Sequence, residues 1–373
     1  MSVEFLPKLA LRANMAINTQ SGSRFLSVMN FHWRICLIFV VSLTCSNLDA
    51  QPPQSKETKA KPAPSVRGDV GQTNADDPKP ATPQPTFDGE SAFEFLKAVV
   101  DIGPRISGTE GMKRQQQMLK KHFEGLGAQV HLQKFTVRHP NTGQWTELAN
   151  LAVRFHPERR KRLLICCHYD TRPYPDQDKV NPRGIFLGAN DGASGVALLA
   201  ELGKHMNDLE GKFGVDFVFF DGEEFVYVYR RDQMFLGSTY FAKQYAAKRW
   251  PAKYTYGVLV DMVADKDLQI SYEGNSLGYA GRLTRSIWGV AQRLGVKEFI
   301  PKERHKIRDD HLPLNAIAKI RTCDIIDFDY PNPAAQNAYW HTTQDTVENC
   351  SAESLTKVGW VVLEWLKEME RLN

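Results

Sequence analysis

The sequence predicts an α/β fold: a single three-layer α/β/α domain around a central mixed, largely parallel sheet. Short apolar runs typical of buried strands alternate with stretches of helical spacing, which is the pattern of such domains. Polar and acidic residues also follow the ends of several apolar runs. This placement is expected when a site lies beyond the carboxyl ends of parallel strands.

Composition narrows the class of partner. The chain has 373 residues, of which 42% are hydrophobic, 24% charged and 10% aromatic, and its net charge of +4 comes from mixed signs. There is no long run of Lys and Arg and no interleaving of basic and aromatic residues, so the sequence argues against a nucleic-acid partner. We expect a small molecule or a peptide as substrate, and a monomer.

Residues 1–50 have the pattern of a targeting segment. Arg24 and Arg34 precede an apolar run over 35–43, and small and polar residues follow up to Ala50. The run is too short to span a bilayer comfortably, so we expect a cleaved signal peptide and no transmembrane span in the mature chain. We therefore expect the protein to be exported to a periplasm or secreted. A lipoprotein anchor at Cys45 is the less favoured alternative, because Thr44 before it fits a lipobox poorly.

Residues 51–86 are rich in Pro, Lys, Gln, Thr and Asp and nearly free of large apolar side chains. Such a composition cannot bury a core, so we interpret the segment as a disordered linker. The folded region is then expected to span 87–373 as one domain.

Within that domain the pattern of apolar residues predicts each element in order. Helical spacing predicts helices over 91–100, 111–126, 192–206, 237–247, 277–294 and 351–372. Alternating or continuous apolar runs predict strands over 130–137, 148–155, 162–167, 215–220, 256–263 and 322–328. The stretch 171–187 is polar and is expected to be a long loop.

The cysteines are expected to be buried free thiols. Cys166 and Cys167 are adjacent in an apolar strand and lack the spacing of a zinc pair, and Cys323 and Cys350 are the others in the predicted domain. A disulfide is the alternative for an exported protein, with no connectivity given by the sequence.

The strand over 215–220 ends in an acidic turn. Its apolar run is interrupted only by Asp216, and it stops at Asp221, Glu223 and Glu224 around Gly222. Each carboxylate costs free energy to desolvate unless it is paired or binds a metal. Glycine permits a tight turn, so one glutamate can bind a metal while its neighbour moves protons. A solvated acidic turn is the plain alternative.

Five residues are candidate metal ligands. They lie beyond predicted strand ends or in loops: His168, Asp191, Glu224, Asp261 and His341. Imidazole nitrogen and carboxylate oxygen are the donors that zinc takes in catalytic sites. Taken singly, Asp191 would also fit a helix cap and His341 a surface loop. His311 has no second ligand at metal spacing, and we expect it to support Asp309.

Together these segments resemble the M28 zinc aminopeptidase superfamily. The matching pieces are His168-Tyr169-Asp170, Asn190-Asp191-Gly192-Ala193-Ser194-Gly195, Asp221-Gly222-Glu223-Glu224, Leu259-Val260-Asp261 and His341-Thr342. The resemblance covers about residue 87 to 373 and implies a zinc exopeptidase-like form of the predicted fold.

Within that superfamily the chain is most similar to the glutaminyl-peptide cyclotransferases. Three segments carry the similarity. The first is the run from Phe219 to Glu224, together with the aromatic-rich insert that follows it and the stretch from Asp232 to Ser238. The other two are Arg308-Asp309-Asp310-His311-Leu312-Pro313 and Trp340-His341-Thr342. The resemblance implies conversion of an N-terminal glutamine of a peptide to pyroglutamate, with release of ammonia.

The resemblance also implies roles for individual residues. Asp191, Glu224 and His341 would hold one zinc ion. Glu223 would shuttle the proton, with Asp261 and Asp309 as a supporting acidic network. Trp340 would line the glutamine pocket. Tyr229 and Arg308 would contact substrate, and both differ from the residues of the family at these positions. The family has a pocket tryptophan in place of Tyr229, and its animal members have a glutamine in place of Arg308.

Two other functions stay open. A two-zinc aminopeptidase would use His168 and Asp261 for a second metal, with Asp191 bridging and Glu223 activating a water. A catalytically inactive binding domain would have lost a ligand or the catalytic glutamate, and none is missing.

Overall fold

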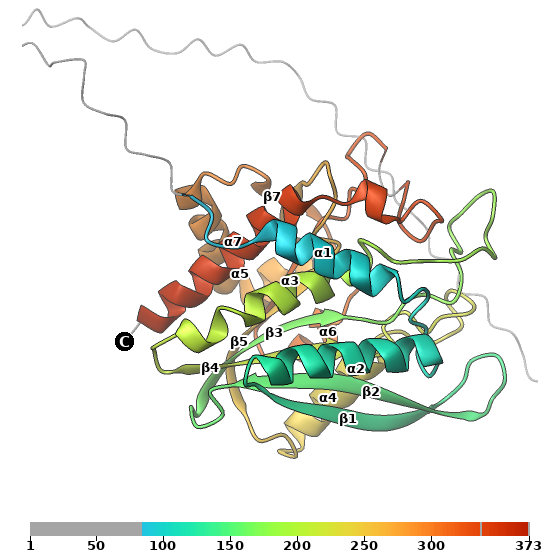
Figure 1. Cartoon of the computed structure of the whole chain (residues 1–373), viewed down its shortest axis with the longest axis horizontal. Coiled ribbons are helices and arrows are strands. Elements are labelled where there is room, and N and C mark those ends of the chain that lie inside the picture. The colour runs from blue at the N-terminus through green and yellow to red at the C-terminus, as the bar shows by residue number, and fades with distance from the viewer. Residues whose placement is uncertain (1–83, 336–337, 372–373) are drawn as a thin grey trace, which may run out of the picture. The chain divides into compact units, whose positions relative to one another are not determined.

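The computed structural model describes residues 84–335 and 338–371, and all statements below concern these residues. The predicted signal peptide over 1–50 and the linker up to residue 83 lie outside them. The described chain forms a central sheet covered by helices on both faces (Figure 1). The predicted α/β/α fold class is confirmed.

The central sheet has six strands in the order β1-β2-β4-β3-β5-β8. Their bounds are β1 (Gln129–Arg138), β2 (Trp145–Phe155), β3 (Lys161–His168), β4 (Phe213–Phe220), β5 (Lys253–Asp261) and β8 (Thr322–Ile326). β1 and β2 form an antiparallel pair, and β2 joins β4 antiparallel. β4, β3, β5 and β8 are mutually parallel, so the sheet is mixed as predicted.

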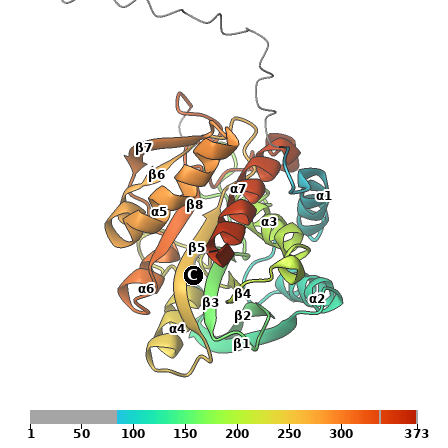
Figure 2. The same ribbon diagram turned by 90° about the vertical axis from the view of Figure 1, so that its left-hand side faces the viewer.

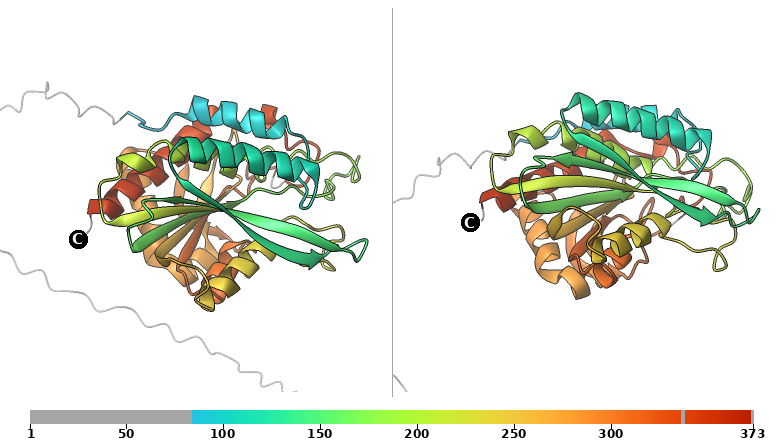
Figure 3. Two further views of the ribbon diagram at one scale, coloured as in Figure 1. Left: turned by 60° about the horizontal axis from the view of Figure 1, so that its bottom comes forward. Right: turned by 90° about the horizontal axis from the view of Figure 1, so that it is seen from below.

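Helices cover both faces of this sheet. They are α1 (Gly89–Val100), α2 (Glu110–Gly125), α3 (Ala193–Gly203), α4 (Leu236–Ala246), α5 (Gly274–Leu294), α6 (His311–Ala316) and α7 (Ala352–Arg371), with 3-10 turns η1 (Met206–Asp208) and η2 (Val347–Asn349). Figure 2 shows α1, α2, α3 and α7 on one side and α4 and α6 on the other. α5 packs on β8 and against α7. Figure 3 shows the long β1–β2 hairpin between α2 and α4.

The alternation of side chains along β3 explains the two helical layers. Leu163, Ile165 and Cys167 face the larger core under α1, α2, α3 and α7. Leu164 and Cys166 face the smaller core under α4 and α6. Because successive residues of a strand point to opposite faces, an apolar run without polar breaks is what a sheet buried on both sides requires.

Asp216, the one polar residue in the β4 run, is buried among partners. It accepts hydrogen bonds from Arg162 at 2.9 Å from Nε, from Arg154 and from the hydroxyl of Tyr254 at 2.6 Å. The side chain of Arg162 is 2% exposed. The break in the apolar pattern therefore marks a buried polar cluster that ties β4 to β2, β3 and β5.

Three elements were not predicted. A second, parallel two-stranded sheet is formed by β6 (Ile270–Glu273) and β7 (Phe299–His305), and α6 is a short helix. The described cysteines are all buried free thiols, which confirms that interpretation. Within the part of the chain that the structure covers, no helix has the length and apolarity needed to cross a membrane.

The parallel strands bring the predicted site residues to one edge. β3 ends at His168, β4 at Phe220 and β5 at Asp261. His168 pairs with Phe220 across the sheet, so these strands end at the same level. The expectation that the polar clusters meet beyond the carboxyl ends of parallel strands is therefore met.

Candidate metal centre

The turn after β4 separates the three carboxylates that follow it. Gly222 has φ +78°, and a Cβ there would lie 2.7 Å from Cδ2 of Leu148, so both conformation and space require glycine. Asp221 points back into the sheet, where its Oδ2 accepts the backbone N–H of Ala149 at 2.8 Å. Glu223 and Glu224 lie beyond the turn.

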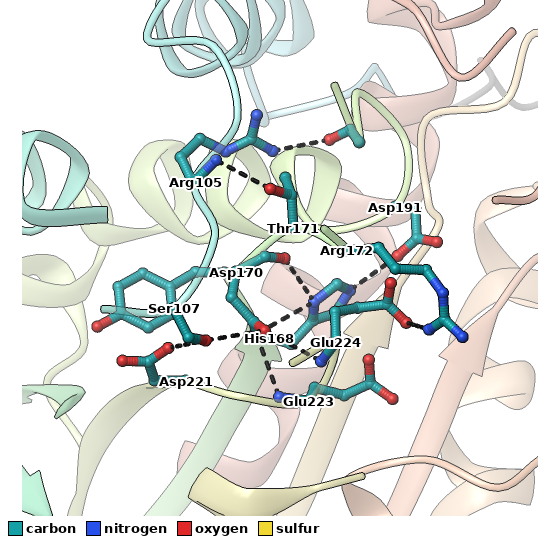
Figure 4. A network of polar contacts seen from close by, with 12 residues as sticks. Arg105, Ser107, His168, Asp170, Thr171, Arg172, Asp191, Asp221, Glu223 and Glu224 are labelled. Carbon is teal, nitrogen blue, oxygen red and sulfur yellow. Dashed lines mark hydrogen bonds and ion pairs between the residues drawn. The ribbon is translucent and has the colours of Figure 1, made fainter. Parts of the chain in front are cut away.

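Asp170 holds this turn from the neighbouring strand end (Figure 4). Its Oδ1 accepts the backbone N–H of Glu223 at 3.2 Å, and its Oδ2 accepts that of Glu224 at 3.0 Å. The hydroxyl of Ser107 lies between Asp170 and Asp221, 2.6 Å from the Oδ1 of Asp221. Burial raises the pKa of Asp170 to about 6 and that of Asp221 to about 8, so these two carboxyls tend to keep a proton between them.

Asp191, Glu224 and His341, the predicted zinc ligands, come together from three separate loops. One donor atom from each lies within 4.8 Å of the others, and all three residues are buried. Nε2 of His341 is 3.2 Å from Oε1 of Glu224 and 3.4 Å from Oδ2 of Asp191. His341 has φ +54°, an unusual conformation for histidine that aims its ring at the two carboxylates.

His168 and Asp261 form a second triad with the same Asp191. Nε2 of His168 is 3.1 Å from Oδ1 of Asp191 and 3.2 Å from Oδ1 of Asp261. Nδ1 faces the backbone carbonyl of Asp170 at 3.2 Å. Burial works against charge on His168, but Asp261 and Asp191 raise its pKa well above the usual value. A protonated His168 offsets one of these two carboxylate charges.

The first triad has the chemistry that a zinc ion requires. Oδ2 of Asp191 and Oε2 of Glu224 are buried and make no hydrogen bond. Leaving buried carboxylate oxygens unpaired is costly, and a cation satisfies them. A mixed set of one imidazole and two carboxylates is typical of catalytic zinc, so the residues fit the ion that the sequence predicts.

Two residues of the long loop support these ligands. The guanidinium of Arg172 binds Glu224 through Nη1 at 2.7 Å and Asp176 through Nε at 2.9 Å. Asp176 in turn lies 3.5 Å from Nδ1 of His341. Burial would raise the pKa of Glu224, but Arg172 and His341 hold it below its usual range. The pair therefore keeps Glu224 ionised and orients two of the three ligands.

The loop that carries Asp191 is anchored at both ends. Asp345 accepts the backbone N–H groups of Asn190 at 2.7 Å and of Asp191 at 3.0 Å. The buried guanidinium of Arg105 donates to the carbonyls of Leu187 and Gly188, the latter at 2.9 Å. The position of Asp191 is thus fixed by two distant segments, and not by the helix cap considered from the sequence, because the residue before α3 is Gly192.

Glu223 follows Gly222 beside this site. It is 7% exposed, and its side chain extends to the same side as that of Glu224 (Figure 4). Burial, together with the charge of Glu224, raises its pKa well above the usual value. Asp309 is also buried, and burial with the nearby Asp261 raises its pKa in the same way. The predicted catalytic glutamate and acidic network are therefore adjacent.

His311 is more than a support for Asp309. Its Nε2 is 3.3 Å from Oε2 of Glu273, and its Nδ1 is 3.5 Å from Oδ2 of Asp324. One donor atom from each of Asp309, His311 and Asp324 lies within 4.8 Å of the others. The expectation that His311 lacks a second potential ligand is wrong, because Glu273 and Asp324 come from elements distant in the sequence.

The three predicted substrate contacts line two different cavities. Trp340 stacks on His341 with 3.7 Å between ring centroids and lines a cavity of about 710 Å³ with residues 177–181. Tyr229 and Arg308 line another cavity, of about 850 Å³, and both are exposed. The structure therefore does not bring Tyr229 and Arg308 into the same pocket as Trp340.

Sequence reasoning missed Arg172, Asp176, Asp345 and Arg105 as parts of this site. Arg172 and Asp176 stand in a polar loop where charged residues are common, and Asp345 has no distinctive neighbours. Arg172 is four residues before Asp176, and both follow the His168-Tyr169-Asp170 segment. Proximity to that segment was the one available signal.

Comparison with known proteins agrees with this geometry. The sequence profile of Peptidase family M28 matches residues 150–366. The chain is 39% identical to a glutaminyl cyclase of Fimbriiglobus ruber of known crystal structure, over 78% of this chain and 99% of that one, with a TM-score of 0.71.

Two further relatives point the same way. A Zn-dependent exopeptidase from Parabacteroides distasonis is 32% identical over 77% of this chain and 99% of its own, with a TM-score of 0.70. The glutaminyl-peptide cyclotransferase of Bothrops jararaca is 26% identical over 296 residues, which cover 70% of this chain and 77% of the relative. The chain therefore belongs to Peptidase family M28 and, within it, to the glutaminyl cyclases.

Proposed function

We propose that this chain is a zinc-dependent glutaminyl-peptide cyclotransferase, an acyltransferase that converts the N-terminal glutamine of a peptide to pyroglutamate and releases ammonia. The observation that carries the proposal is the placement of Glu223 beside the buried triad of Asp191, Glu224 and His341. Membership among the glutaminyl cyclases supports it.

Asp191, Glu224 and His341 would hold one zinc ion. When bound, zinc supplies Lewis-acid polarisation of the γ-carbonyl of the glutamine. Arg172 and Asp176 keep two of these ligands in place through the contacts described above. Oδ2 of Asp191 and Oε2 of Glu224 are the buried acceptors left over for the ion.

Glu223 would move the proton. Its carboxylate accepts a proton from the α-amine as the amine nitrogen forms a bond to the γ-carbonyl carbon. The bond from that carbon to the amide nitrogen then breaks, and Glu223 returns the proton to the departing ammonia. A pKa raised by burial and by Glu224 suits a group that must both accept and donate.

Asp261 and Asp309 would support this transfer. Both are buried, and their mutual repulsion adds to the effect of burial on the pKa of Asp309. A proton held in this pair limits the negative charge beside Glu223. The indole of Trp340, stacked on His341, would form one wall for the glutamine side chain.

A two-metal aminopeptidase is the second candidate, and one specific observation favours it. His168, Asp261 and Asp191 also place donor atoms within 4.8 Å of one another, so a second ion would find three buried ligands. In that enzyme Glu223 would activate a water molecule. We favour the cyclase because of the chain's similarity to glutaminyl cyclases.

One experiment separates these functions. The purified protein is incubated with a glutaminyl dipeptide and with a leucyl amide, and product mass and zinc per chain are measured on the same sample. Loss of ammonia from the glutaminyl peptide, no free leucine and about one zinc per chain are expected. Glu223→Gln should abolish turnover and retain zinc, because it removes the proton acceptor and leaves the ligands.

Other results would point elsewhere. Free leucine with two metals per chain would establish the aminopeptidase. No turnover and no bound metal would favour an inactive binding domain, the third function considered. Glu223→Gln with parental turnover would contradict the role proposed for Glu223 in either enzyme.

The proposal extends to the segments that the structure does not describe. We propose a catalytic domain over 87–373, preceded by a linker over 51–86 and a cleaved signal peptide over 1–50. The order of basic, apolar and small residues supports export. Mass spectrometry of the N-terminus of the mature protein tests this point.

A further inference from the structure

A second cavity, separate from that of Trp340, is lined by β1, the segment 229–235, α4 and Arg308. Its volume is about 850 Å³. Phe135 of β1 and Tyr240 of α4 stack in its wall with 4.8 Å between ring centroids. Phe235, which is buried, adds a further apolar surface. We call this cavity the Arg308 groove. It has an aromatic wall large enough to accept several peptide residues.

The rim of the Arg308 groove is strongly cationic. Its charged residues are Arg230, Arg231, Asp232, Lys243 and Arg308. Only Arg231 is paired within the groove, with Nε 2.7 Å from Oδ1 of Asp232. The other oxygen of Asp232 accepts backbone N–H groups of the same segment, so this carboxylate is fully engaged.

The other three cations are available to a ligand. Arg230, Lys243 and Arg308 are exposed, and none has a carboxylate within ion-pair distance among residues 84–335 and 338–371. Arg308 lies over the ring of Phe235, with 5.9 Å from its guanidinium carbon to the centroid. Arg230 lies over the ring of Tyr229 at 5.6 Å. Stacking on rings limits the motion of both guanidinium groups and leaves their edges free for carboxylates.

The groove begins beside the acidic network of the active site. Ile307 is buried in a cluster that includes Met262, next to Asp261, and against which Trp340 packs. Asp309 is buried in the acidic network itself. Arg308, between them, points outward into the groove. Leu236, which also lines the groove, donates its backbone N–H to the carbonyl of Gly222 at 3.0 Å, so the groove begins beside the turn that carries Glu223.

A bound peptide would therefore reach the cations after its first residue. Its N-terminal glutamine occupies the metal centre, and each following residue extends the chain by about 3.3 Å. The second to fourth residues then pass Arg308 and Tyr229 and approach Arg230 and Lys243. The wall offers no carboxylate except the engaged Asp232, so it suits acidic side chains and repels basic ones.

We propose that the Arg308 groove binds acidic residues downstream of the N-terminal glutamine and makes this enzyme select acidic peptides. The inference rests on the proposed function, because it assumes that the N-terminal residue lies at the metal centre. Arg230, Lys243 and Arg308 act as specificity-determining residues through charge, and Tyr229 through contact with the peptide backbone.

The first test compares two glutaminyl peptides on the zinc-loaded full chain. The sequences Gln-Ala-Glu-Glu-Ala and Gln-Ala-Lys-Lys-Ala differ only at the third and fourth residues, where two acidic side chains replace two basic ones. We expect kcat/KM to favour the acidic peptide by about five- to tenfold at low salt, from two or three exposed ion pairs. The ratio should approach one at 1 M salt, where the screening length is about 3 Å. Equal kcat/KM values at low salt would overturn the proposal.

The test variant combines Arg230→Gln with Lys243→Gln. Its matched control is Lys121→Gln, on the exposed face of α2. The double variant should reduce the acidic-to-basic ratio of kcat/KM at least threefold, mainly through KM, and Lys121→Gln should not change that ratio. A ratio equally changed in the control would show a general charge effect and refute the groove. Melting curves confirm that each variant is folded.

A binding measurement keeps this inference apart from the proposed function. A fluorescent acidic peptide with an N-terminal glycine cannot cyclise, and its anisotropy reports binding alone. If the double variant weakens binding severalfold while the parent chain does not cyclise glutaminyl peptides, the groove is supported and the cyclase is rejected. Cyclisation with no dependence of binding on Arg230 and Lys243 would support the cyclase and reject the groove.

Discussion

Arg172 and Glu224 are in direct contact, with Nη1 of the guanidinium 2.7 Å from Oε1 of the carboxylate, and both side chains are almost fully buried. A buried cation beside a metal ligand opposes the charge of the metal, but Arg172 also keeps Glu224 ionised and fixes its orientation. Arg172 leaves one oxygen of Glu224 without a hydrogen bond. The contact therefore holds the carboxylate in place with one oxygen still free to bind the proposed zinc.

Replacing Arg172 by glutamine is expected to weaken zinc binding about 10- to 100-fold, the usual effect of removing an outer partner of a metal ligand. The apparent Kd for zinc is measured by competition with a chelator. Arg183→Gln, an exposed arginine of the same loop, serves as the control. Unchanged affinity in Arg172→Gln would mean that Glu224 is oriented by the turn alone.

Arg162→Met should destabilise the fold by about 3–5 kcal/mol, because it leaves Asp216 as a buried carboxylate that has lost its main partner. Urea unfolding measures the change. The exposed Arg160→Met is the matched control and should shift stability by less than about 0.5 kcal/mol. A loss as small as that of the control would show that Arg154 and Tyr254 suffice to satisfy Asp216.

Asp327 makes stability depend on pH. Burial raises its pKa to about 8, whereas an unfolded chain has a value near 3.9. Between these values the folded state holds a proton that the unfolded state lacks, so the free energy of unfolding falls as pH rises from about 4 to about 8. The contribution of one such group is at most about 1.4 kcal/mol per pH unit.

Asp327→Asn should remove this part of the slope. Urea unfolding at several pH values between 5 and 8, on the parent and the variant, gives the comparison, with exposed Asp101→Asn as control. Parallel slopes in parent and Asp327→Asn would count against a raised pKa for Asp327.

His311→Gln should make the protein more sensitive to acid. Burial alone would raise the pKa of Glu273, but the close approach of His311, together with the backbone N–H groups of Asn275 and Ile307, lowers it to about 2. A depressed carboxylate pKa stabilises the fold above the unfolded value, near 4.3, and this stabilisation is lost as pH falls toward 2. Without His311 the midpoint of acid unfolding, followed by circular dichroism, should move to higher pH. His131→Gln, at an exposed strand position, should leave it unchanged.

The fold was predictable where hydrophobic periodicity carries the signal. β3 and β4 are buried along nearly their whole length and appear as plain apolar runs. β7 was missed because its middle residues are exposed and include Pro301, Lys302 and Glu303, which have no alternation. α6 has six residues, too few for a helical period to show. Such elements exist because neighbours pack on them, which no local pattern reveals.

The proposed ligands were predictable from residue type and their place after strands. The residues that hold these ligands in place were not predictable. Glu273 and Asp324 meet His311 from positions far apart in the chain, and only the folded sheet brings them together. Asp345 reaches Asn190 across 155 residues of sequence. Long-range pairing of this kind leaves no spacing to detect.

The three proposed ligands come from loops that follow β3, β4 and β8, and His341 is the last of them in the chain. During synthesis a growing chain lacks its third ligand until every described strand has emerged. Binding by all three ligands therefore has to wait until the last of these strands has been synthesised. Zinc supply late in synthesis, when the chain completes its fold, would then limit how much metal-bound protein forms.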